Sequence, residues 1–403
     1  MAVLSSKDLM FENRTLWGVS TAAAVRSIGY GATWPFMAVY FNEYLHLSLI
    51  FVGFIFTLNA ALSIVFSLFA GYLSDVIGRK WTLISGSVAG FILYALLALL
   101  VYRAVLIASA LFVMTAFSGS LVYPSANAIV SDVTTEKNRE MGYTVYRIMA
   151  NLGWAVGPLI SSFIFRYGFE FIFLFVAVAN LLSTIVSLLY VKRNVRYREA
   201  KRNFFVVDYR LYLFSIPVFL LIMVSSQFSV TLPIFVVEDL HIVVSNLGYF
   251  YAVNGTVVVI GQYPISKLMS RYPDIYALVF GAIFYSIGYL MVSFSRNLPS
   301  LIIDMIIITI GENLTSPNIN TVVSKIAPKE SVGQFMGFIG MVNQLARAAA
   351  PSVGTLILYS LGQRPGLVWP VIDIFGISAA ILFFSFRGLF VPRKRIRGAA
   401  MQN

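Results

Sequence analysis

The sequence predicts an all-α membrane protein whose twelve transmembrane helices form two six-helix bundles related by pseudo-two-fold symmetry. Three observations carry this prediction: an apolar composition, twelve apolar segments of helical length, and a repeat that relates the two halves. The chain has 403 residues, of which 59% are hydrophobic and 11% charged, and its mean hydropathy is +0.83. Soluble domains carry about 25% charged residues, so this composition indicates a chain that lies in a bilayer.

The twelve apolar segments are each long enough to cross a hydrocarbon core about 30 Å thick, which needs about 20 helical residues. We place them near residues 16–40, 48–73, 82–102, 105–130, 141–165, 169–191, 211–236, 245–268, 276–294, 299–324, 332–360 and 367–390. Residues 1–17 lack the basic region, short apolar core and cleavage site of a secretory signal. We therefore expect the first segment to remain in the protein.

The positions of the basic residues predict the orientation. The net charge is +12, and 22 of the 29 Lys and Arg residues fall in segments that are cytoplasmic if the N-terminus is cytoplasmic, against four in outer segments. This asymmetry predicts that both termini are cytoplasmic. Because the bases lie between apolar runs and not on a soluble face, we expect no nucleic-acid partner.

The predicted domains follow from the longest inner connection, which carries seven basic residues and comes after six spans. A basic segment next to a membrane is attracted to anionic headgroups. We assign residues 1–191 to an N-terminal six-helix bundle, 192–210 to a basic cytoplasmic linker, and 211–403 to a C-terminal six-helix bundle with a short basic tail.

The composition also argues against several classes of function. The chain has no cysteine and two histidines, His46 and His241, so we expect neither a metal site nor another cofactor. The phosphate-binding pattern Gly-x4-Gly-Lys-Ser/Thr does not occur, which argues against ATP as the energy source. No Ser/His/Asp or His/Cys/carboxylate arrangement suggests an enzyme.

An internal repeat relates the two halves. The segment YPSANAIVSD at 123–132 aligns with SPNINTVVSK at 316–325 at an offset of 193, and the same offset pairs Pro158 with Pro351. A weaker echo pairs Pro35 with Pro233 at an offset of 198. Repeats of this kind are typical of transporter folds, which usually place a binding site between the halves.

Two motifs carry a resemblance to a known family. The segment GYLSDVIGRK at 71–80 resembles the signature loop of the major facilitator superfamily, Gly-x-Leu-x-Asp-x-x-Gly-Arg-Lys/Arg, in its place between the second and third spans. The segment GWAVGPLIS on the fifth span, with Gly153, Gly157 and Pro158, is similar to the Gly-x-x-x-Gly-Pro element of the family's drug:proton antiporters. The basic residue that many of these antiporters carry on the fourth span is missing.

The resemblance implies a cytoplasmic gate at the signature loop. Asp75 is implied to face the start of the eleventh span, and Arg79 to meet Asp132 at the end of the fourth. Gly78 permits a tight turn and Gly71 a close backbone approach. We expect these residues, with Arg347, to form the gate. The alternative is an ordinary turn whose charges only set the topology.

Six charged residues lie inside predicted spans, where each costs about 2.5–3.5 kcal/mol unless it faces protein or water. They are Arg26, Arg147, Arg347, Asp304, Glu312 and Asp373. The resemblance implies that the first, fourth, seventh and tenth spans line the central cavity, which makes Glu312 the first candidate for a protonatable coupling residue. Its alternative is a structural ion pair.

The other members of the predicted coupling and substrate cavity are less specific. Arg26 and Arg147 set the potential of the cavity, bind an anionic substrate, or form structural pairs. Asp304 is either an outer gate or a wetted cavity mouth, and Asp373 is expected to be structural. Polar and aromatic side chains complete the cavity: Asn59, Gln227, Tyr30 and Trp34.

The resemblance implies a secondary active transporter that works by alternating access. The element on the fifth span favours proton-coupled export of small organic compounds, whereas the intramembrane arginines favour the alternative, proton-linked transport of an organic anion or other metabolite. A transporter-like membrane sensor is an alternative of another class. We expect a small-molecule substrate and protons as partners, and a monomer in the lipid bilayer of the cell membrane.

Overall fold

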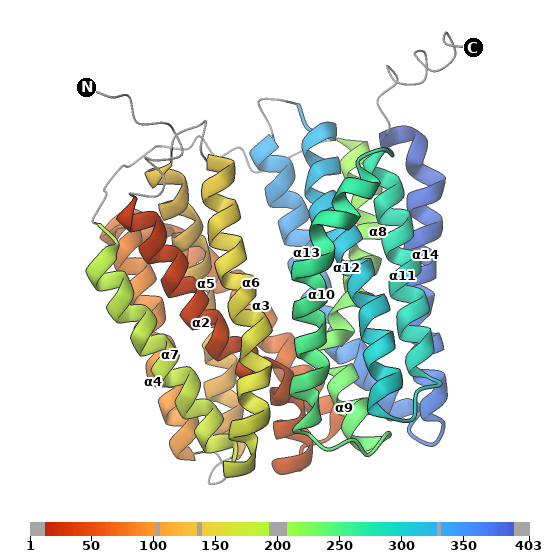
Figure 1. The fold of residues 1–403 in the computed structure, drawn as a ribbon, viewed down its shortest axis with the longest axis horizontal. Coiled ribbons are helices and arrows are strands. Elements are labelled where there is room, and N and C mark those ends of the chain that lie inside the picture. The colour runs from red at the N-terminus through yellow and green to blue at the C-terminus, as the bar shows by residue number, and fades with distance from the viewer. Residues whose placement is uncertain (1–12, 101–104, 135–138, 193–207, 329–331, 391–403) are drawn as a thin grey trace. The chain divides into compact units, whose positions relative to one another are not determined.

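The computed structural model describes residues 13–100, 105–134, 139–192, 208–328 and 332–390, without nine of their side chains. Those nine belong to residues 68, 71, 72, 75, 139, 140, 332, 333 and 390. Every regular element in these ranges is a helix (Figure 1). The first half contains α2 (Arg14–Val39), η1 (Tyr40–Tyr44), α3 (Leu49–Ile77), α4 (Arg79–Leu100), α5 (Val105–Val133), α6 (Arg139–Ile164), η2 (Phe165–Tyr167) and α7 (Phe169–Tyr190).

The second half follows the same plan with one interruption. It contains α8 (Tyr209–Ser225), η3 (Ser226–Ser229), α9 (Thr231–Glu238), α10 (Asn246–Met269), α11 (Asp274–Val292), α12 (Leu298–Ile326), α13 (Val332–Ser360), η5 (Pro365–Leu367) and α14 (Val368–Phe390). Nine of the described helices are long and apolar enough to cross a membrane. Helices α2, α10 and α13 coincide with the remaining predicted spans.

The seventh predicted span is not one continuous helix, as the sequence had suggested. It runs as α8, the short 3₁₀ turn η3, and the eight-residue α9. Pro233 in the first turn of α9 has no backbone N–H with which to continue the preceding helix, which explains why the regular pattern is interrupted just before it. Proline at the first turn of a helix leaves the rest of that helix intact.

The chain divides into two compact units that do not coincide with its sequential halves. The first unit consists of Met1–Ala200 together with Phe228–Thr256 and Pro351–Leu356. The second consists of Lys201–Gln227, Val257–Ala350 and Ile357–Asn403. In the first unit α2 packs against α6 and α7, and α4 packs against α5 and α7. In the second, α11 packs against α12 and α14. The division into two halves joined by a linker at 192–210 stays a prediction.

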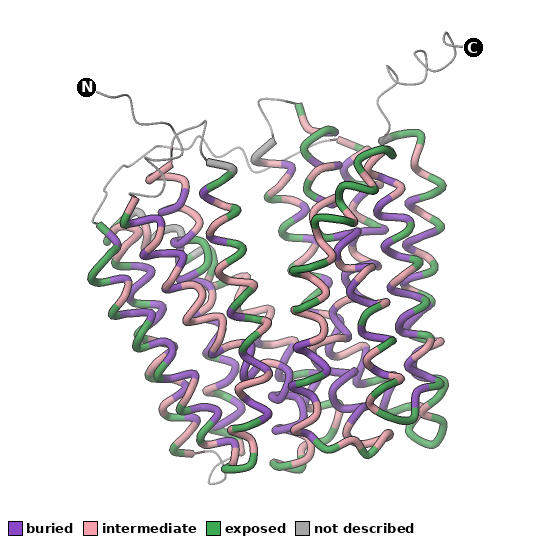
Figure 2. Tube along the Cα trace, viewed as in Figure 1, coloured by how far each residue is buried: buried purple, intermediate pink, exposed green. Residues whose placement is uncertain are grey.

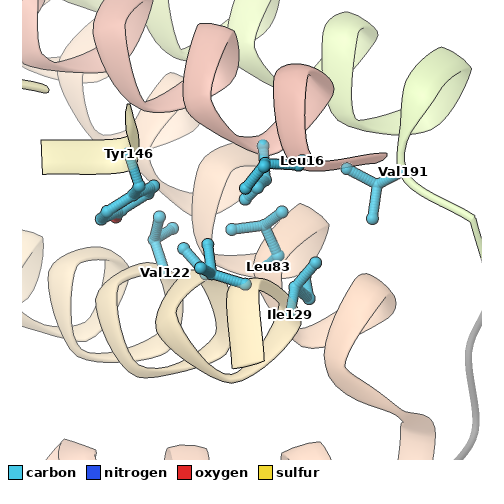
Figure 3. Close-up of a cluster of buried hydrophobic side chains, with 9 residues drawn as sticks. Leu16, Leu83, Val122, Ile129, Tyr146 and Val191 are labelled. Carbon is cyan, nitrogen blue, oxygen red and sulfur yellow. The ribbon is translucent and has the colours of Figure 1, made fainter. Parts of the chain in front are cut away.

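Within the first unit a buried cluster joins the ends of four helices and the residue after α7 (Figure 3). Leu16, Leu83, Ile129, Tyr146 and Val191 belong to it. These side chains come from α2, α4, α5 and α6, and Val191 directly follows α7. Along each helix buried and exposed stretches alternate (Figure 2), as expected for helices that face protein on one side only.

The internal repeat extends to the ends of the first helix of each half. His46 and His241 both have a positive φ, 53° and 55°. Each follows the same backbone pattern: the amide of Leu47 donates to the carbonyl of Phe41 (3.0 Å), and that of Ile242 to Val236 (3.1 Å). These bonds each reach back six residues, and they satisfy carbonyls that a helix end would leave unpaired. The two caps are equivalent at an offset of 195.

Candidate functional site

The signature loop is a tight turn between α3 and α4. Gly78 has a φ of +88°, a conformation that residues with a Cβ rarely adopt. A Cβ at this position would meet no described atom within 4 Å, so the turn requires glycine for its backbone conformation and not for space. The side chain of Asp75 lies outside the described residues, as does the environment of Gly71. Their predicted roles in the gate stay predictions.

Arg79 fixes the start of α4 to the end of α5. Its guanidinium forms an ion pair with Asp132 and donates a hydrogen bond to the carbonyl of Ala128 at 2.9 Å. The two side chains of the pair are 28% and 16% exposed. Next to it, the ammonium of Lys80 donates to the carbonyl of Leu188 at 2.9 Å. The contact that the resemblance implied for Arg79 is therefore present, and its role as a gate is a proposal.

The second half carries an equivalent ion pair with the charges exchanged, which the sequence analysis missed. Asp274 is the first residue of α11, and Lys325 lies in the last turn of α12; the two form an ion pair. At the equivalent positions of the first half, α4 begins with the base Arg79, and the helix that follows it, α5, carries the acid Asp132 near its end. The sequence held a signal for this, because the repeat aligns Asp132 with Lys325.

The two pairs differ in their relation to the helix dipoles. A helix N-terminus favours an acid and a C-terminus favours a base, by about 0.3–1 kcal/mol each. Asp274 and Lys325 follow this rule, whereas Arg79 and Asp132 both oppose it. The charges of the Arg79–Asp132 pair are thus unfavourable for the dipoles of their own helices, whereas those of the Asp274–Lys325 pair are favourable.

Arg26 lies among tyrosines in the first unit. Its guanidinium carbon is 4.5 Å from the centre of the Tyr30 ring, in a cation–π contact. Its Nε is buried without a hydrogen-bond partner. The ring of Tyr30 packs edge-on against that of the fully buried Tyr94, at 5.6 Å between centroids. Within the described residues no carboxylate forms an ion pair with Arg26.

The remaining charges inside the spans fall into two groups. Arg147 on α6 and Arg347 on α13 are exposed, and neither forms an ion pair in the described part of the chain. Asp304 and Asp373 are buried, at 1% and 2% exposure. Ser295 donates a hydrogen bond to the Asp304 carboxylate at 2.6 Å. Burial at 1% contradicts the wetted cavity mouth that was one expectation for Asp304.

Glu312 is half-buried on α12. It lies close enough to Tyr285 of α11 to interact with that buried side chain electrostatically, and so does Arg347. Tyr285 therefore lies within the fields of both an acid and a base of the second unit. The sequence analysis did not single out this tyrosine.

Three uncharged residues assigned to the cavity are instead engaged in packing. The buried amide of Asn59 donates to the carbonyls of Phe112 (2.9 Å) and Val113 (3.3 Å), which ties α3 to α5. Gln227 is 1% exposed and donates to the carbonyl of Ala350 at 3.2 Å. Trp34 packs against aromatic rings, with Phe56 at 5.6 Å. The amides of Asn59 and Gln227 thus bond to backbone carbonyls, and the assignment of all three residues to a substrate cavity stays a prediction.

The element on the fifth span is a helix-packing site. A Cβ at Gly157 would lie 2.5 Å from both the amide nitrogen of Ala32 and the carbonyl oxygen of Ile28 on α2. Gly153 lies equally close to α2, and the ring of Pro158 approaches Gly31. The glycines therefore let α6 and α2 pack backbone to backbone, as small residues do between membrane helices.

A group of acidic residues in the first unit, at the ends of η1 and α9, was also missed by the sequence analysis. Glu43 of η1 interacts electrostatically with Glu238 at the end of α9. Burial, Glu43 and Asp239 raise the pKa of Glu238 to about 7, and burial raises the pKa of Asp239 as well. Among the described residues no group of three or more His, Cys, Asp or Glu side chains is arranged to hold a metal ion.

Comparison with known proteins decides the family. The profile of the Major Facilitator Superfamily matches residues 19–351. The chain belongs to the major facilitator superfamily. A solved POT family transporter in complex with a thioalcohol-conjugated peptide matches with a TM-score of 0.78 at 17% identity, covering 94% of this chain and 97% of that one. This likeness confirms the predicted all-α fold in two bundles, and with the family it makes the protein a multi-pass membrane transporter.

The curated relatives are similar over most of their length. An uncharacterized MFS-type transporter, YqjV of Bacillus subtilis, is 29% identical, covering 88% of this chain and 89% of that protein. The Na⁺, Li⁺, K⁺/H⁺ antiporter of Planococcus maritimus is 24% identical, with 79% and 83% covered. The multidrug resistance protein MdtH of Edwardsiella ictaluri is 24% identical, with 91% and 92% covered.

Proposed function

We propose that this transporter exports small organic compounds across the cell membrane in exchange for protons, by alternating access, with both termini in the cytoplasm. The observation that carries the proposal is the half-buried carboxyl group of Glu312 in the middle of α12. Ionisable residues inside membrane spans are costly, and they typically mark ion pathways and proton relays. Glu312 is the residue to which we assign the coupling proton.

The names of two relatives support parts of the proposal. One relative is named a cation/H⁺ antiporter and another a multidrug resistance protein. A proton gradient is also sufficient in magnitude. A potential of 100 mV contributes about 2.3 kcal/mol per charge, and one pH unit adds about 1.4 kcal/mol. Together these support a substrate ratio of several hundredfold.

The test is a transport assay in proteoliposomes with an imposed pH gradient. A panel of cationic, neutral and anionic compounds is offered to the native protein and to Glu312→Gln. We expect the variant to lose gradient-driven accumulation but to keep exchange of labelled for unlabelled substrate, because exchange needs no net proton movement. The matched control is Glu170→Gln, an acid in the first turn of α7 outside the assigned site.

Two results contradict the proposal. If Glu312→Gln keeps the gradient dependence of the native protein, Glu312 does not carry the proton. If a correctly folded native protein moves no compound of the panel under any gradient, the protein is not an exporter of this kind, and the alternative of a transporter-like sensor gains support.

A further inference from the structure

We propose that Arg26 and the tyrosines around it form a subsite of the first unit that binds the carboxylate of an amphipathic organic anion. The inference deepens the proposed function by naming the charge of the substrate, and it rests on that function only for the use of the site in transport. The first argument is the cost of Arg26 itself. A guanidinium within a membrane span is costly unless it faces protein, water or a bound anion.

The structure offers only partial compensation for this charge. Structural arginines inside proteins are normally paired with a carboxylate, but Arg26 forms no ion pair with a carboxylate of the described residues. Arg26 has the ring of Tyr30 at 4.5 Å, and its Nε is buried without a hydrogen bond. A cation–π contact leaves the N–H donors of the guanidinium unsatisfied, because they point along the plane of the fork. The buried Nε therefore lacks an acceptor within the described residues.

The side chains around the guanidinium of Arg26 combine aromatic rings with hydroxyl groups. The hydroxyl of Tyr30 lies 3.4 Å from that of Ser118, which itself donates to the carbonyl of Gly86 at 2.7 Å. Arg26 also interacts electrostatically with Tyr94 and with Tyr146. Tyrosines combine a flat apolar body with one polar tip. Such a lining suits a ligand with an aromatic or aliphatic body and a single anionic group.

Space for the anion lies beside the guanidinium at Gly119 of α5. Within the described residues, the one atom near a Cβ built on Gly119 is Nη2 of Arg26, at 3.9 Å. The glycine leaves this side of the fork uncovered, although α2 and α5 belong to the same packed unit. A planar guanidinium with a free edge matches a carboxylate through two parallel hydrogen bonds. The geometry thus favours carboxylate over a cation, which Arg26 would repel.

The experiment measures equilibrium binding to the full-length protein in detergent, without any gradient. The probes are 2-naphthoate and its uncharged analogue 2-naphthamide, which share the aromatic body. A hydrogen bond to an ionised acceptor is roughly twice as strong as one between neutral groups, so we expect naphthoate to bind at least about tenfold more tightly than naphthamide. This preference should vanish in Arg26→Gln and be reduced but retained in Arg26→Lys, which keeps the charge without the fork.

Two further variants separate binding from folding. Gly119→Leu places a side chain beside Nη2 at a position with free space, and leucine favours a helix over glycine. We expect it to fold and to lose naphthoate binding while Arg26 is intact. Arg166→Gln removes an arginine whose Nε donates to the carbonyl of Phe163 outside the subsite, and it should bind both probes as the native protein does.

Three outcomes would overturn the subsite: native protein that binds the two probes equally, native protein that does not bind naphthoate, and a naphthoate preference that survives in both Arg26→Gln and Gly119→Leu. None of them affects the proposed exporter, because proton-driven transport of cationic or neutral compounds is measured separately. Conversely, loss of all gradient-driven transport alongside an intact naphthoate preference would contradict the exporter and leave the subsite standing.

Discussion

The two equivalent ion pairs should respond in opposite ways to a reversal of their charges. The perturbation is Arg79→Asp with Asp132→Lys in the first half, and Asp274→Lys with Lys325→Asp in the second. Each reversal keeps an ion pair but changes its relation to the helix dipoles. In the first half, the native charges at positions 79 and 132 are unfavourable for the helix dipoles, and the reversed charges would be favourable. In the second half, the native charges at positions 274 and 325 are favourable, and the reversed charges would be unfavourable.

The magnitude follows from the dipole interaction. Each residue contributes about 0.3–1 kcal/mol with a sign that reversal inverts, so two residues change the free energy of unfolding by about 1–4 kcal/mol. Partial exposure of the side chains, 50% and 27% in the Lys325–Asp274 pair, screens part of this. The first-half variant also loses the hydrogen bond from Arg79 to Ala128, worth about 1 kcal/mol.

We therefore expect the first-half reversal to leave stability unchanged or to raise it by about 1 kcal/mol, and the second-half reversal to lower it by about 1–2 kcal/mol. The assay is unfolding of the purified protein by sodium dodecyl sulfate in mixed micelles at low salt, followed by tryptophan fluorescence. Added salt should shrink the difference between the two variants, because salt screens partly exposed charges.

The single substitutions complete the cycle. Arg79→Gln and Asp132→Asn each break the Arg79–Asp132 pair. With side chains 28% and 16% exposed, this pair is intermediate between two classes. Exposed surface pairs contribute about 0.2–1 kcal/mol to stability, and breaking a buried pair costs about 3–5 kcal/mol. We expect a coupling free energy of about 1–2 kcal/mol. The reasoning fails if both charge reversals shift stability in the same direction by the same amount.

Three further predictions concern packing and protonation. Gly157→Ala should destabilise the protein by several kcal/mol, at least about 3, because its Cβ would meet the backbone of α2 at 2.5 Å; Gly340→Ala, where no described atom lies within 4 Å, is the neutral control in thermal unfolding. Asn59→Leu should cost about 1–3 kcal/mol, because the buried hydrogen bonds from its amide to the carbonyls of Phe112 and Val113 are lost; unchanged unfolding would contradict this. Because the pKa of Glu238 is raised from an ordinary 4.5 to about 7, stability falls as pH rises through this window; Glu238→Gln should remove that fall in melting curves, and Glu43→Gln should move it to lower pH.

Much of the candidate site could not be predicted because its partners are far apart in the chain. The sequence singled out Asn59 and Gln227 as polar residues in spans, but their hydrogen bonds run to Phe112 and Ala350, which no local pattern relates to them. The glycines of the fifth span were singled out through a family motif, but the motif did not identify their contacts. Only the contact of Gly157 with Ala32 shows that they serve the packing of two helices.

The sequence by itself determined the membrane class, the positions of the spans and the family, because span length, hydropathy and the loop at Gly78 and Arg79 are local properties of the chain. The tertiary structure decided the partners of the other charges. It paired Asp274 with Lys325 and left Arg26 beside Tyr30 without an ion-paired carboxylate among the described residues. Which charges pair depends on how each helix is rotated about its axis and packed against its neighbours. That rotation is determined by contacts among many side chains that are far apart in the sequence.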